Sequence, residues 1–242
     1  MDNDIYGQAL LDYQNGNYTE DITTYLSLEE EDTLPLPYLF RDYKKMPLIE
    51  KHALKLCKGN VLDIGCGAGS HSFILQQKEF SITAVTAIDF SKGAIETCKL
   101  RGVKNTICTN LYDFKDQKFD TLLLLMNGIG IAGKVNQLDS FFTHLKSLLN
   151  PGGQILLDSS DIIYMYENDH EDGGYWIPDG IEYYGEVSFH MEYKGKKSET
   201  FPWLYLDYNT LQRAANYNNL NCELVFEGEY YDFLARLTLL EY

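Results

Sequence analysis

The feature that most constrains this chain is the segment VLDIGCGAGSHSFIL, at residues 61–75. Its glycines at positions 65, 67 and 69 lie between a short apolar run and a stretch with helical periodicity. Glycine adopts positive φ angles and lets a ligand approach the backbone without meeting a Cβ atom. The first turn of a helix adds free N–H groups that can bind a ligand. The segment therefore predicts a buried strand, a tight ligand-binding loop and a helix.

Strands and helices alternate after this loop as they do in parallel sheets. Five apolar runs are typical of buried parallel strands, and the amphipathic stretches between them are typical of helices. The predicted strands are 60–65, 82–89, 105–110, 119–126 and 154–160, and the predicted helices are 70–80, 91–103 and 136–150. A helix at 209–220 and strands at 221–228 and 231–242 close the chain. This alternation predicts an α/β fold with a doubly wound, mostly parallel sheet of seven strands.

Two regions do not follow this alternation. Residues 182–208 predict a β-hairpin around a Lys-Gly turn, inside an insertion that runs from 161 to 208. Residues 1–58 are interpreted as a helical and irregular segment that covers the domain. The expected organisation is a covering segment at 1–58, an α/β domain at 59–160 and 209–242, and an inserted hairpin at 161–208.

The negative charge of the chain argues against nucleic acids and anionic membranes as partners. The formal net charge is −16, which repels nucleic-acid phosphates and anionic lipids. The N-terminal residues MDNDIYG carry no apolar core, so we expect no signal peptide, and the aliphatic run 122–126 is too short to span a bilayer. The five cysteines lack metal-binding spacing and are interpreted as reduced thiols. We therefore expect a cytoplasmic protein that binds neither nucleic acid nor membrane.

The order of residues in the glycine loop separates two classes of ligand. Dinucleotide sites favour G-x-G-x-x-G, but here Ser70 stands at the third position and Gly69 comes one residue early. The pattern is D-x-G-x-G-x-G, beginning at Asp63. It resembles motif I of the class I S-adenosylmethionine (SAM)-dependent methyltransferases.

The resemblance continues in order over about residues 60–160 and again over 209–242. Asp89 stands where the family places an acidic residue on the ribose hydroxyls, and Asn110-Leu111 stands at the adenine-binding position. FDTLLLLMNGIG resembles motif IV, and LLNPGGQILL resembles the segment after it. The resemblance implies a Rossmann-like methyltransferase fold, SAM as cofactor and S-adenosylhomocysteine (SAH) as product. The cofactor-binding residues that it implies in this domain are Asp63, Gly65, Cys66, Gly67, Asp89, Phe90, Asn110, Leu111 and Asn127.

Departures from the family's patterns narrow the reaction. Asn127 begins Asn-Gly-Ile-Gly rather than Asn-Pro-Pro-Tyr, which argues against N-methylation of adenine or glutamine. No Asp/Asp/Asn set is recognisable in the sequence, so we expect no metal. Asn110 stands where the family often has Asp, and its amide can also bond the adenine edge.

The residues that end the five parallel strands point to the same site. In an open α/β sheet, ligands bind outside the carboxyl ends of the strands. The predicted ends are Gly65, Asp89, Asn110, Asn127 and Asp158, four of them polar. Asp and Asn are also common in turns for purely structural reasons, so a structural role is the alternative for these residues.

Candidates for catalysis are few. His71 opens the helix after the glycine loop and could take a proton or orient the acceptor, or could simply be a polar first-turn residue. The segment at 37–47 resembles the N-terminal cover of small-molecule methyltransferases. By that resemblance, Arg41 pairs with the methionine carboxylate of SAM, and Tyr38 or Tyr43 faces the sulfonium. A helix packed on the domain with a surface arginine is the alternative.

The insertion is the expected wall of the acceptor pocket. It leaves the sheet after the fifth strand and carries many acidic and aromatic residues, which suit a compact neutral or cationic acceptor such as an amine. The predicted acceptor contacts are Asp158, Asp161, Tyr43 and Trp203. A solvated acidic hairpin, or a contact between two copies in a homodimer, is the alternative.

The function expected from this sequence is methyl transfer from SAM to an unidentified small-molecule acceptor. Two other readings stay open at this point. One is an oxidoreductase of the NAD type, which the glycine spacing and the expected reversed last strand disfavour. The other is a SAM-binding protein of the same fold without turnover.

Overall fold

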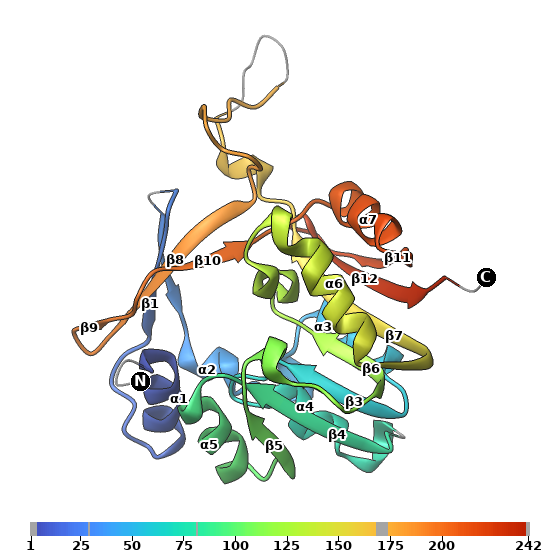
Figure 1. Cartoon of the computed structure of the whole chain (residues 1–242). Coiled ribbons are helices and arrows are strands. Elements are labelled where there is room, and N and C mark those ends of the chain that lie inside the picture. Colours follow the sequence, from blue (N-terminus) through green and yellow to red (C-terminus); the bar gives the residue numbers. More distant parts are fainter. Residues whose placement is uncertain (1–3, 29, 81, 168–173, 241–242) are drawn as a thin grey trace.

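The computed structural model describes residues 4–28, 30–80, 82–167 and 174–240. Its main element is a seven-stranded sheet in the order β11-β12-β7-β6-β3-β4-β5 (Figure 1). Five neighbouring strands run parallel, and β12 runs antiparallel to both of its neighbours. The strands are β3 (Asn60–Ile64), β4 (Ala84–Asp89), β5 (Asn105–Cys108), β6 (Phe119–Leu124), β7 (Leu149–Ser160), β11 (Leu220–Glu227) and β12 (Asp232–Leu239). The predicted doubly wound, mostly parallel sheet with a reversed last strand is therefore confirmed.

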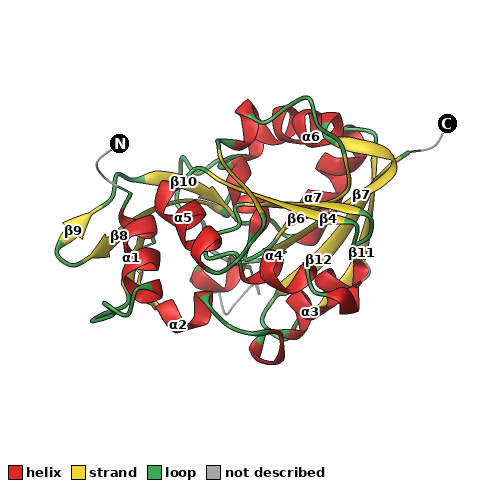
Figure 2. Ribbon diagram, turned by 90° about the horizontal axis from the view of Figure 1, so that it is seen from below, coloured by secondary structure: helices red, strands yellow, loops and turns green. Residues whose placement is uncertain are grey.

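Helices cover both faces of this sheet. Figure 2 shows α6 on one side of the strands and α3 and α4 on the other. Two of the helices begin at side-chain caps, Ser91 before α5 and Asp207 before α7, which satisfy free N–H groups of the first turn. The helices of the domain are α3 (Leu48–Leu56), α4 (Ser70–Leu75), α5 (Lys92–Leu100), α6 (Leu138–Ser147) and α7 (Tyr208–Tyr217).

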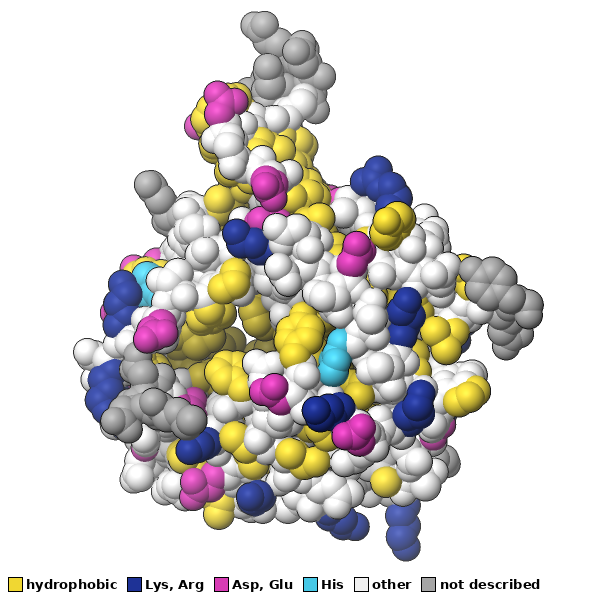
Figure 3. Space-filling view, in the orientation of Figure 1, with side chains coloured by type: hydrophobic (Ala, Val, Ile, Leu, Met, Phe, Trp, Pro, Cys, Tyr) yellow, Lys and Arg dark blue, Asp and Glu magenta, His cyan; other side chains and the backbone are white. Residues whose placement is uncertain are grey.

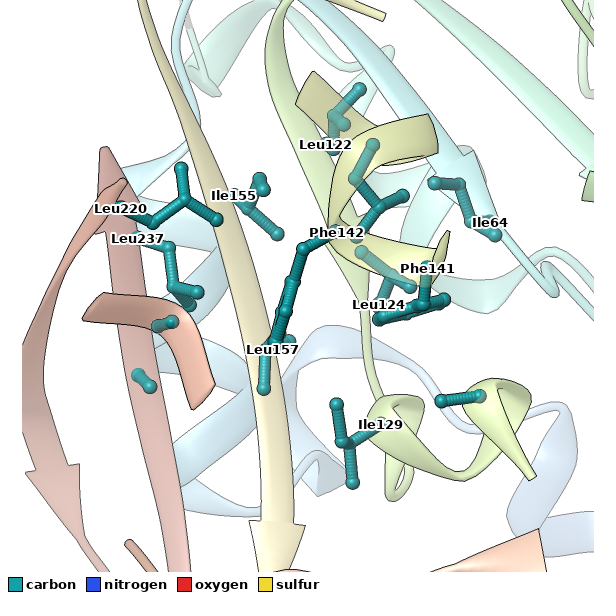
Figure 4. Packing of buried hydrophobic residues seen from close by; sticks show 14 of the residues in the cluster. Ile64, Leu122, Leu124, Ile129, Phe141, Phe142, Ile155, Leu157, Leu220 and Leu237 are labelled. Atoms are coloured by element: carbon teal, nitrogen blue, oxygen red, sulfur yellow. The ribbon is translucent and has the colours of Figure 1, made fainter. Parts of the chain in front are cut away.

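The aliphatic strands build a separate hydrophobic core on each face, because successive side chains of a strand point in opposite directions. Leu122 and Leu124 of β6 pack on one face with Phe141 and Phe142 of α6. Leu123, between them in the chain, packs on the other face with the residues of α3 and α4. Figure 4 shows side chains of the first core gathered between α6 and the strands β6 and β7.

The order of the strands fixes where a ligand site can form. From β3 the chain proceeds outward to β4 and β5, then returns to β6 on the opposite side of β3 and proceeds to β7. The loops that follow β3 and β6 therefore run in opposite directions. Between them, at the carboxyl ends of these two strands, the sheet has an opening at its switch point.

A second sheet stands beside the carboxyl edge of the first. Its order is β10-β8-β1-β2, with β9 paired to β8. The Lys194-Gly195 turn, with φ angles of 49° and 69°, joins β8 to β9 as the predicted hairpin. The strands are β1 (Ile22–Leu26), β2 (Glu30–Leu34), β8 (Glu186–Tyr193), β9 (Lys196–Lys197) and β10 (Phe201–Leu204).

The prediction that residues 1–58 are helical and irregular is wrong for β1 and β2. The sequence of β2 reads EEDTL, and acidic residues are depleted in strands, so local propensity gave no signal. Both strands owe their conformation to pairing, since β1 lies between β2 and β8. The N-terminal segment and the insertion thus form one sheet.

The first half of the insertion differs from the hairpin that follows it. Its described residues, 161–167 and 174–185, project away from the body of the molecule (Figure 1). Its aromatic side chains pack on one another, with the rings of Tyr183 and Tyr184 at 4.5 Å and the Tyr166 hydroxyl donating to the Tyr184 carbonyl. The centre of the insertion, 168–173, lies outside the described residues.

Two N-terminal helices complete the cover, α1 (Ile5–Gln14) and α2 (Leu36–Leu39). Asp4 caps α1 at the Gly7 N–H and also accepts from Ser91 Oγ and the Gly93 N–H, so it ties α1 to the start of α5. The backbones of α1 and α5 are in contact, because a Cβ added to Gly93 of α5 would come within 2.5 Å of the Gly7 carbonyl of α1. In the part of the chain that the structure describes, no helix has both the length and the apolar character needed to cross a membrane.

Candidate functional site

The glycine loop follows β3 directly, as the sequence predicted. The N–H groups of Gly65 and Cys66 both donate to the Ile88 carbonyl of β4, at 2.9 and 3.1 Å, which closes the turn against the neighbouring strand. Gly65, Gly67 and Gly69 all have positive φ angles, which glycine adopts without steric strain. The loop is therefore held in one shape by the sheet, with Gly69 at the start of α4.

Asp89 ends β4 and connects this strand to the loop. Its Oδ2 accepts from the Gly67 N–H and its Oδ1 from the Ser91 N–H, both at 2.9 Å. Burial raises the pKa of this carboxyl to about 6, although both backbone hydrogen bonds oppose the shift. A carboxylate held by two backbone groups keeps further lone pairs available for hydroxyl donors.

The side chains of two predicted cofactor-binding residues, Asp63 and Cys66, contact other side chains inside the domain. Asp63 accepts a 2.6 Å hydrogen bond from Ser72 Oγ, which ties β3 to α4, and burial raises the pKa of its carboxyl. Cys66 lies 3.7 Å, sulfur to sulfur, from Cys98 of α5. Both groups shape the loop from inside the domain.

The loop after β5 has a different character. Asn110 Oδ1 accepts from the Tyr112 N–H at 3.0 Å and so caps the next turn, while Leu111 is buried in the core. Phe90, after β4, keeps 78% of its surface exposed and belongs to no core cluster of the described residues. An exposed phenylalanine and a polar turn thus flank the carboxyl ends of β4 and β5.

The end of β6 is conformationally strained. Met126 and Asn127 both have left-handed φ angles, of 67° and 58°, which residues other than glycine rarely adopt. Asp158 of β7 holds this turn by accepting from the Met126 and Gly128 N–H groups at 3.0 and 2.8 Å. Asn127 donates to the Leu204 carbonyl at 3.0 Å, and its buried Oδ1 has no hydrogen-bond partner among the described residues. The turn therefore joins both sheets and leaves one acceptor atom unused.

A buried polar cluster lies where the N-terminal segment meets α4. Glu50 of α3 forms a two-bond ion pair with Arg41 and a 2.9 Å hydrogen bond with His71 Nε2. Arg41 also donates to the Tyr38 carbonyl, and its guanidinium lies 4.0 Å from the centre of the Tyr38 ring. Burial opposes ionisation of Glu50, but the contacts with His71 and Arg41 prevail and lower the pKa of its carboxyl. Arg41 is thus buried and paired, not a surface residue.

Two of the predicted acceptor contacts, Tyr43 and Asp161, have partners outside the polar cluster. Tyr43 packs edge-on against Phe80, which follows the C-terminal end of α4. The glycine loop lies at the other end of this helix. Tyr43 and Phe80 line a cavity of about 310 Å³. Asp161 accepts from the Tyr184 hydroxyl and the Ile163 N–H, so it supports the projecting part of the insertion. The prediction that these two residues line one pocket with Asp158 has no support in the contacts.

Trp203 of β10, by contrast, reaches the carboxyl edge of the main sheet. Its ring covers Gly130, where a Cβ would come within 2.2 Å of its Nε1. Gly130 belongs to the short 3₁₀ helix Gly128–Ala132 that follows the strained turn. Figure 3 shows a hollow lined with hydrophobic side chains on this face, in the region that Figure 1 assigns to β1, β8, α2 and the turn after β6.

Sequence reasoning missed two residues of this region. Glu50 shares the buried face of α3 with Ile49, Ala53 and Leu54, and a charged residue on an apolar face was the signal that could have found it. Tyr6 of α1 places its hydroxyl 2.6 Å from where a Cβ of Gly67 would be, and no pattern in the sequence indicates this contact. In the described ranges no group of three His, Cys, Asp or Glu side chains is arranged to hold a metal ion.

Comparisons with known proteins agree on one family. Residues 57–201 match a protein-family model described as a methyltransferase domain. A SAM-dependent methyltransferase from Bacteroides fragilis, solved in complex with SAH, is 41% identical, with a TM-score of 0.90 over 99% of this chain and 96% of that chain. A search of curated proteins found no match.

Two more distant structures share the fold alone. An S-adenosylmethionine-dependent methyltransferase from Clostridium acetobutylicum is 16% identical, with a TM-score of 0.60 over 85% of this chain and 95% of that chain. DhpI, solved with SAH, is 15% identical, with a TM-score of 0.57 over 97% of each chain.

Proposed function

The chain belongs to the class I SAM-dependent methyltransferases, and from this premise we propose that it methylates a small-molecule acceptor bound between its two sheets. The cofactor is SAM and the product is SAH, in keeping with the complex of the 41% identical relative. The alternatives of a NAD-type oxidoreductase and of a binding protein without turnover are not favoured by these matches.

The residues of the carboxyl edge fit this cofactor. Asp89 presents a buried carboxylate, already oriented by two backbone N–H groups, and a ribose offers the hydroxyl donors that such an acceptor needs. The loop Gly65–Gly69 allows close approach to its backbone, and the exposed ring of Phe90 offers a flat apolar surface beside it. We propose that these residues, with Asn110 and Leu111, hold the nucleoside end of SAM.

Bound SAM supplies a methyl group activated by its positive sulfur, so the protein needs only to orient the acceptor, exclude water and manage a proton. The cover formed by α1, α2 and the second sheet is suited to excluding water. His71 is a candidate for proton transfer, although its Nε2 already bonds Glu50. Arg41 remains a candidate for the carboxylate of the methionine end, where it would share its guanidinium with Glu50.

The observation that carries this proposal is the pair of Asp89 and the glycine loop. Replacing Asp89 by Ala should raise the Kd for SAM by about 30-fold or more, because hydrogen bonds to a charged acceptor contribute about 2–4 kcal/mol. Isothermal calorimetry measures this directly. Glu96→Ala, an exposed carboxylate on the outer face of α5, is the matched control and should leave the Kd unchanged.

The reaction is tested by the formation of SAH when the protein is incubated with SAM and a panel of metabolites. Turnover that depends on one acceptor supports the proposal. An Asp89→Ala variant that binds SAM as tightly as the wild type would contradict the assignment of this residue.

We further propose that the protein acts in the cytoplasm, on an acceptor that is not a nucleic acid. All five cysteines are free thiols, which fits the reducing conditions of the cytoplasm. The net charge of −16 disfavours a nucleic-acid substrate. We retain the division into a covering segment, a SAM-binding domain and an insertion, with the second half of the insertion, β8 to β10, as the acceptor wall.

A further inference from the structure

Asp158 has an unusual electrostatic environment for a buried carboxylate. It is 8% exposed and lies at the carboxyl end of β7, beside the switch point of the sheet. Its two hydrogen bonds come from backbone N–H groups, and the side-chain charge that acts on it most strongly is another carboxylate, Glu50. A buried carboxylate beside a like charge is stabilised by a cation or by an incoming proton.

The charge of this carboxylate reaches two tyrosines. Burial raises the pKa of the Tyr38 and Tyr205 phenols, and Asp158 adds to the rise at both, after the effects of Arg41 and Glu50 at Tyr38 and of Tyr164 at Tyr205. Tyr38 already stacks against a cation on one face, the guanidinium of Arg41, and is 39% exposed. Rings next to a carboxylate are the usual surroundings of a bound ammonium group, because the ring faces are negative.

The entrance to the hollow is also acidic. Asp32 of the exposed strand β2 also adds to the rise in the pKa of the Tyr205 phenol, after the effects of burial, Tyr164 and Asp158. Glu30 and Glu31 precede Asp32 on the same exposed edge strand. With a net charge of −16, the molecule attracts cations toward this opening from solution.

We infer that the acceptor is a small cationic amine, whose ammonium group binds Asp158 between the rings of Tyr38 and Tyr205. This inference rests on the proposed function and names the class of its substrate. The unpartnered Oδ1 of Asn127, on the turn that Asp158 holds, supplies a second acceptor for the N–H groups of the amine. An anionic acceptor such as a carboxylic acid or a phosphate ester would face the Asp158 carboxylate and be repelled, whereas Glu50 is already paired with Arg41.

Methylation of an ammonium group first requires the loss of a proton, and Asp158 is the group that takes it. The ammonium first gives one proton to the Asp158 carboxylate, which frees the nitrogen lone pair. The lone pair then forms the new carbon–nitrogen bond while the carbon–sulfur bond breaks and its electron pair remains on sulfur. The methylated product leaves as an ammonium ion, and Asp158 returns its proton to water.

The first test compares acceptors of equal shape. Phenethylamine is paired with phenethyl alcohol, and glucosamine with glucose, and SAH formation is measured for each pair. The amine should be the better substrate by at least about tenfold, because only it carries a positive charge for the Asp158 carboxylate to bind. Equal or faster methylation of either alcohol overturns the inference.

The second test needs no turnover. Benzyltrimethylammonium is a cation that cannot accept a further methyl group, and benzyl alcohol is its neutral comparison. In the presence of SAH, calorimetry should show binding of the cation, weakened by added salt, and at least about tenfold weaker binding of the alcohol. Absence of cation binding overturns the inference even if an acceptor is later found.

Variants connect both tests to the residues. Asp158→Asn should lose cation binding by about tenfold or more while the Kd for SAM stays within a few-fold. Because this change also touches the turn after β6, Tyr38→Leu serves as a second variant that leaves the turn intact and should weaken binding of the cation. Asp116→Asn, an exposed carboxylate at the opposite edge of the sheet, is the control. Unchanged cation binding in both test variants overturns the assignment.

These outcomes separate this inference from the proposed function. Cation binding that depends on Asp158 without any SAH formation supports the amine site and contradicts the methyltransferase reaction. SAH formation with an alcohol or an acid, and no cation binding, supports the reaction and contradicts the amine site.

Discussion

At the scale of single residues, Glu50 is the group whose loss should be most costly. Replacing it by Ala leaves the buried guanidinium of Arg41 without its partner, and breaking a buried ion pair typically costs about 3–5 kcal/mol. The free energy of unfolding, from urea denaturation, should fall by about that amount. Glu223→Ala is the matched control, because its ion pair with Arg236 lies on the surface and should contribute at most about 1 kcal/mol. Equal losses in the two variants would contradict the assignment of Glu50.

The pKa of Asp89 predicts a specific dependence of stability on pH. Its folded-state pKa is raised from the ordinary value of 3.8 to about 6, so the folded protein binds this proton more tightly than the unfolded chain does. The associated stability is therefore fully present below pH 3.8 and is lost as the pH rises through 6. In the absence of ligand, the stability of the wild type relative to Asp89→Asn should fall by about 2 kcal/mol between pH 4 and pH 7.

Urea denaturation of both proteins across this range measures the difference, and other titrating groups cancel because both proteins contain them. A constant difference would show that Asp89 titrates near its ordinary pKa. The sign is opposite for ligand binding, since hydroxyl donors favour the ionised carboxylate, so SAM should bind more tightly as the pH rises through 6.

The residues of the site differ in how far the sequence could predict them. The glycines and Asp89 lie in local patterns, and the structure places them where the strand, loop and strand end were expected. Their roles toward SAM stay predictions. Glu50 meets His71 and Arg41 only through tertiary packing, and no spacing along the chain encodes such a contact. The paired state of Arg41 could not be predicted for the same reason.

At the scale of elements, the contact of α1 with α5 controls the cover of the glycine loop. Gly93→Ala would place a Cβ within 2.5 Å of the Gly7 carbonyl, a backbone atom that cannot move aside without displacing α1. We expect this variant to weaken SAM binding by about tenfold, because α1 carries Tyr6 onto Gly67, and to lower Tm by a few degrees. Calorimetry and a thermal melt measure the two effects.

Lys99→Ala, at an exposed position on the same helix, is the control and should change neither quantity. Tight SAM binding by Gly93→Ala would show that α1 does not support the loop.

The elements also show what local patterns can and cannot predict. All seven strands of the main sheet were predicted within a few residues, except that β7 begins at Leu149, earlier than residue 154. Buried aliphatic runs between glycines and polar residues are a strong local signal. β1 and β2 have mostly half-buried or exposed residues, and their partner β8 lies in a distant part of the chain. Their conformation is a property of the pairing, and so no local pattern contained it.

At the scale of the whole molecule, two sheets with separate hydrogen-bond networks should open separately. Thr24 lies in β1, between β2 and β8, and Thr24→Pro removes a backbone donor from that ladder. Hydrogen exchange of β8 should then accelerate by at least about tenfold, while exchange of β12 in the main sheet stays unchanged. Mass spectrometry of peptides from 186–193 and 232–239 measures both.

Thr24→Val keeps the donor and the strand preference, and should alter neither peptide. Equal acceleration in both peptides would mean that the sheets form one cooperative unit.

The pairing of Leu26 with Phe189 has a consequence for the order in which the protein is made. About 160 residues separate the two strands, and a ribosome needs roughly 10–30 s to add them. The hairpin of β1 and β2 and the strands around the glycine loop thus emerge well before β8. During that interval the residues proposed to hold the nucleoside end of SAM, as far as Leu111, are already translated, while one edge of β1 has no partner strand. This topology therefore makes the loops after β3, β4 and β5 available before the sheet of β10, β8, β1 and β2 can be completed.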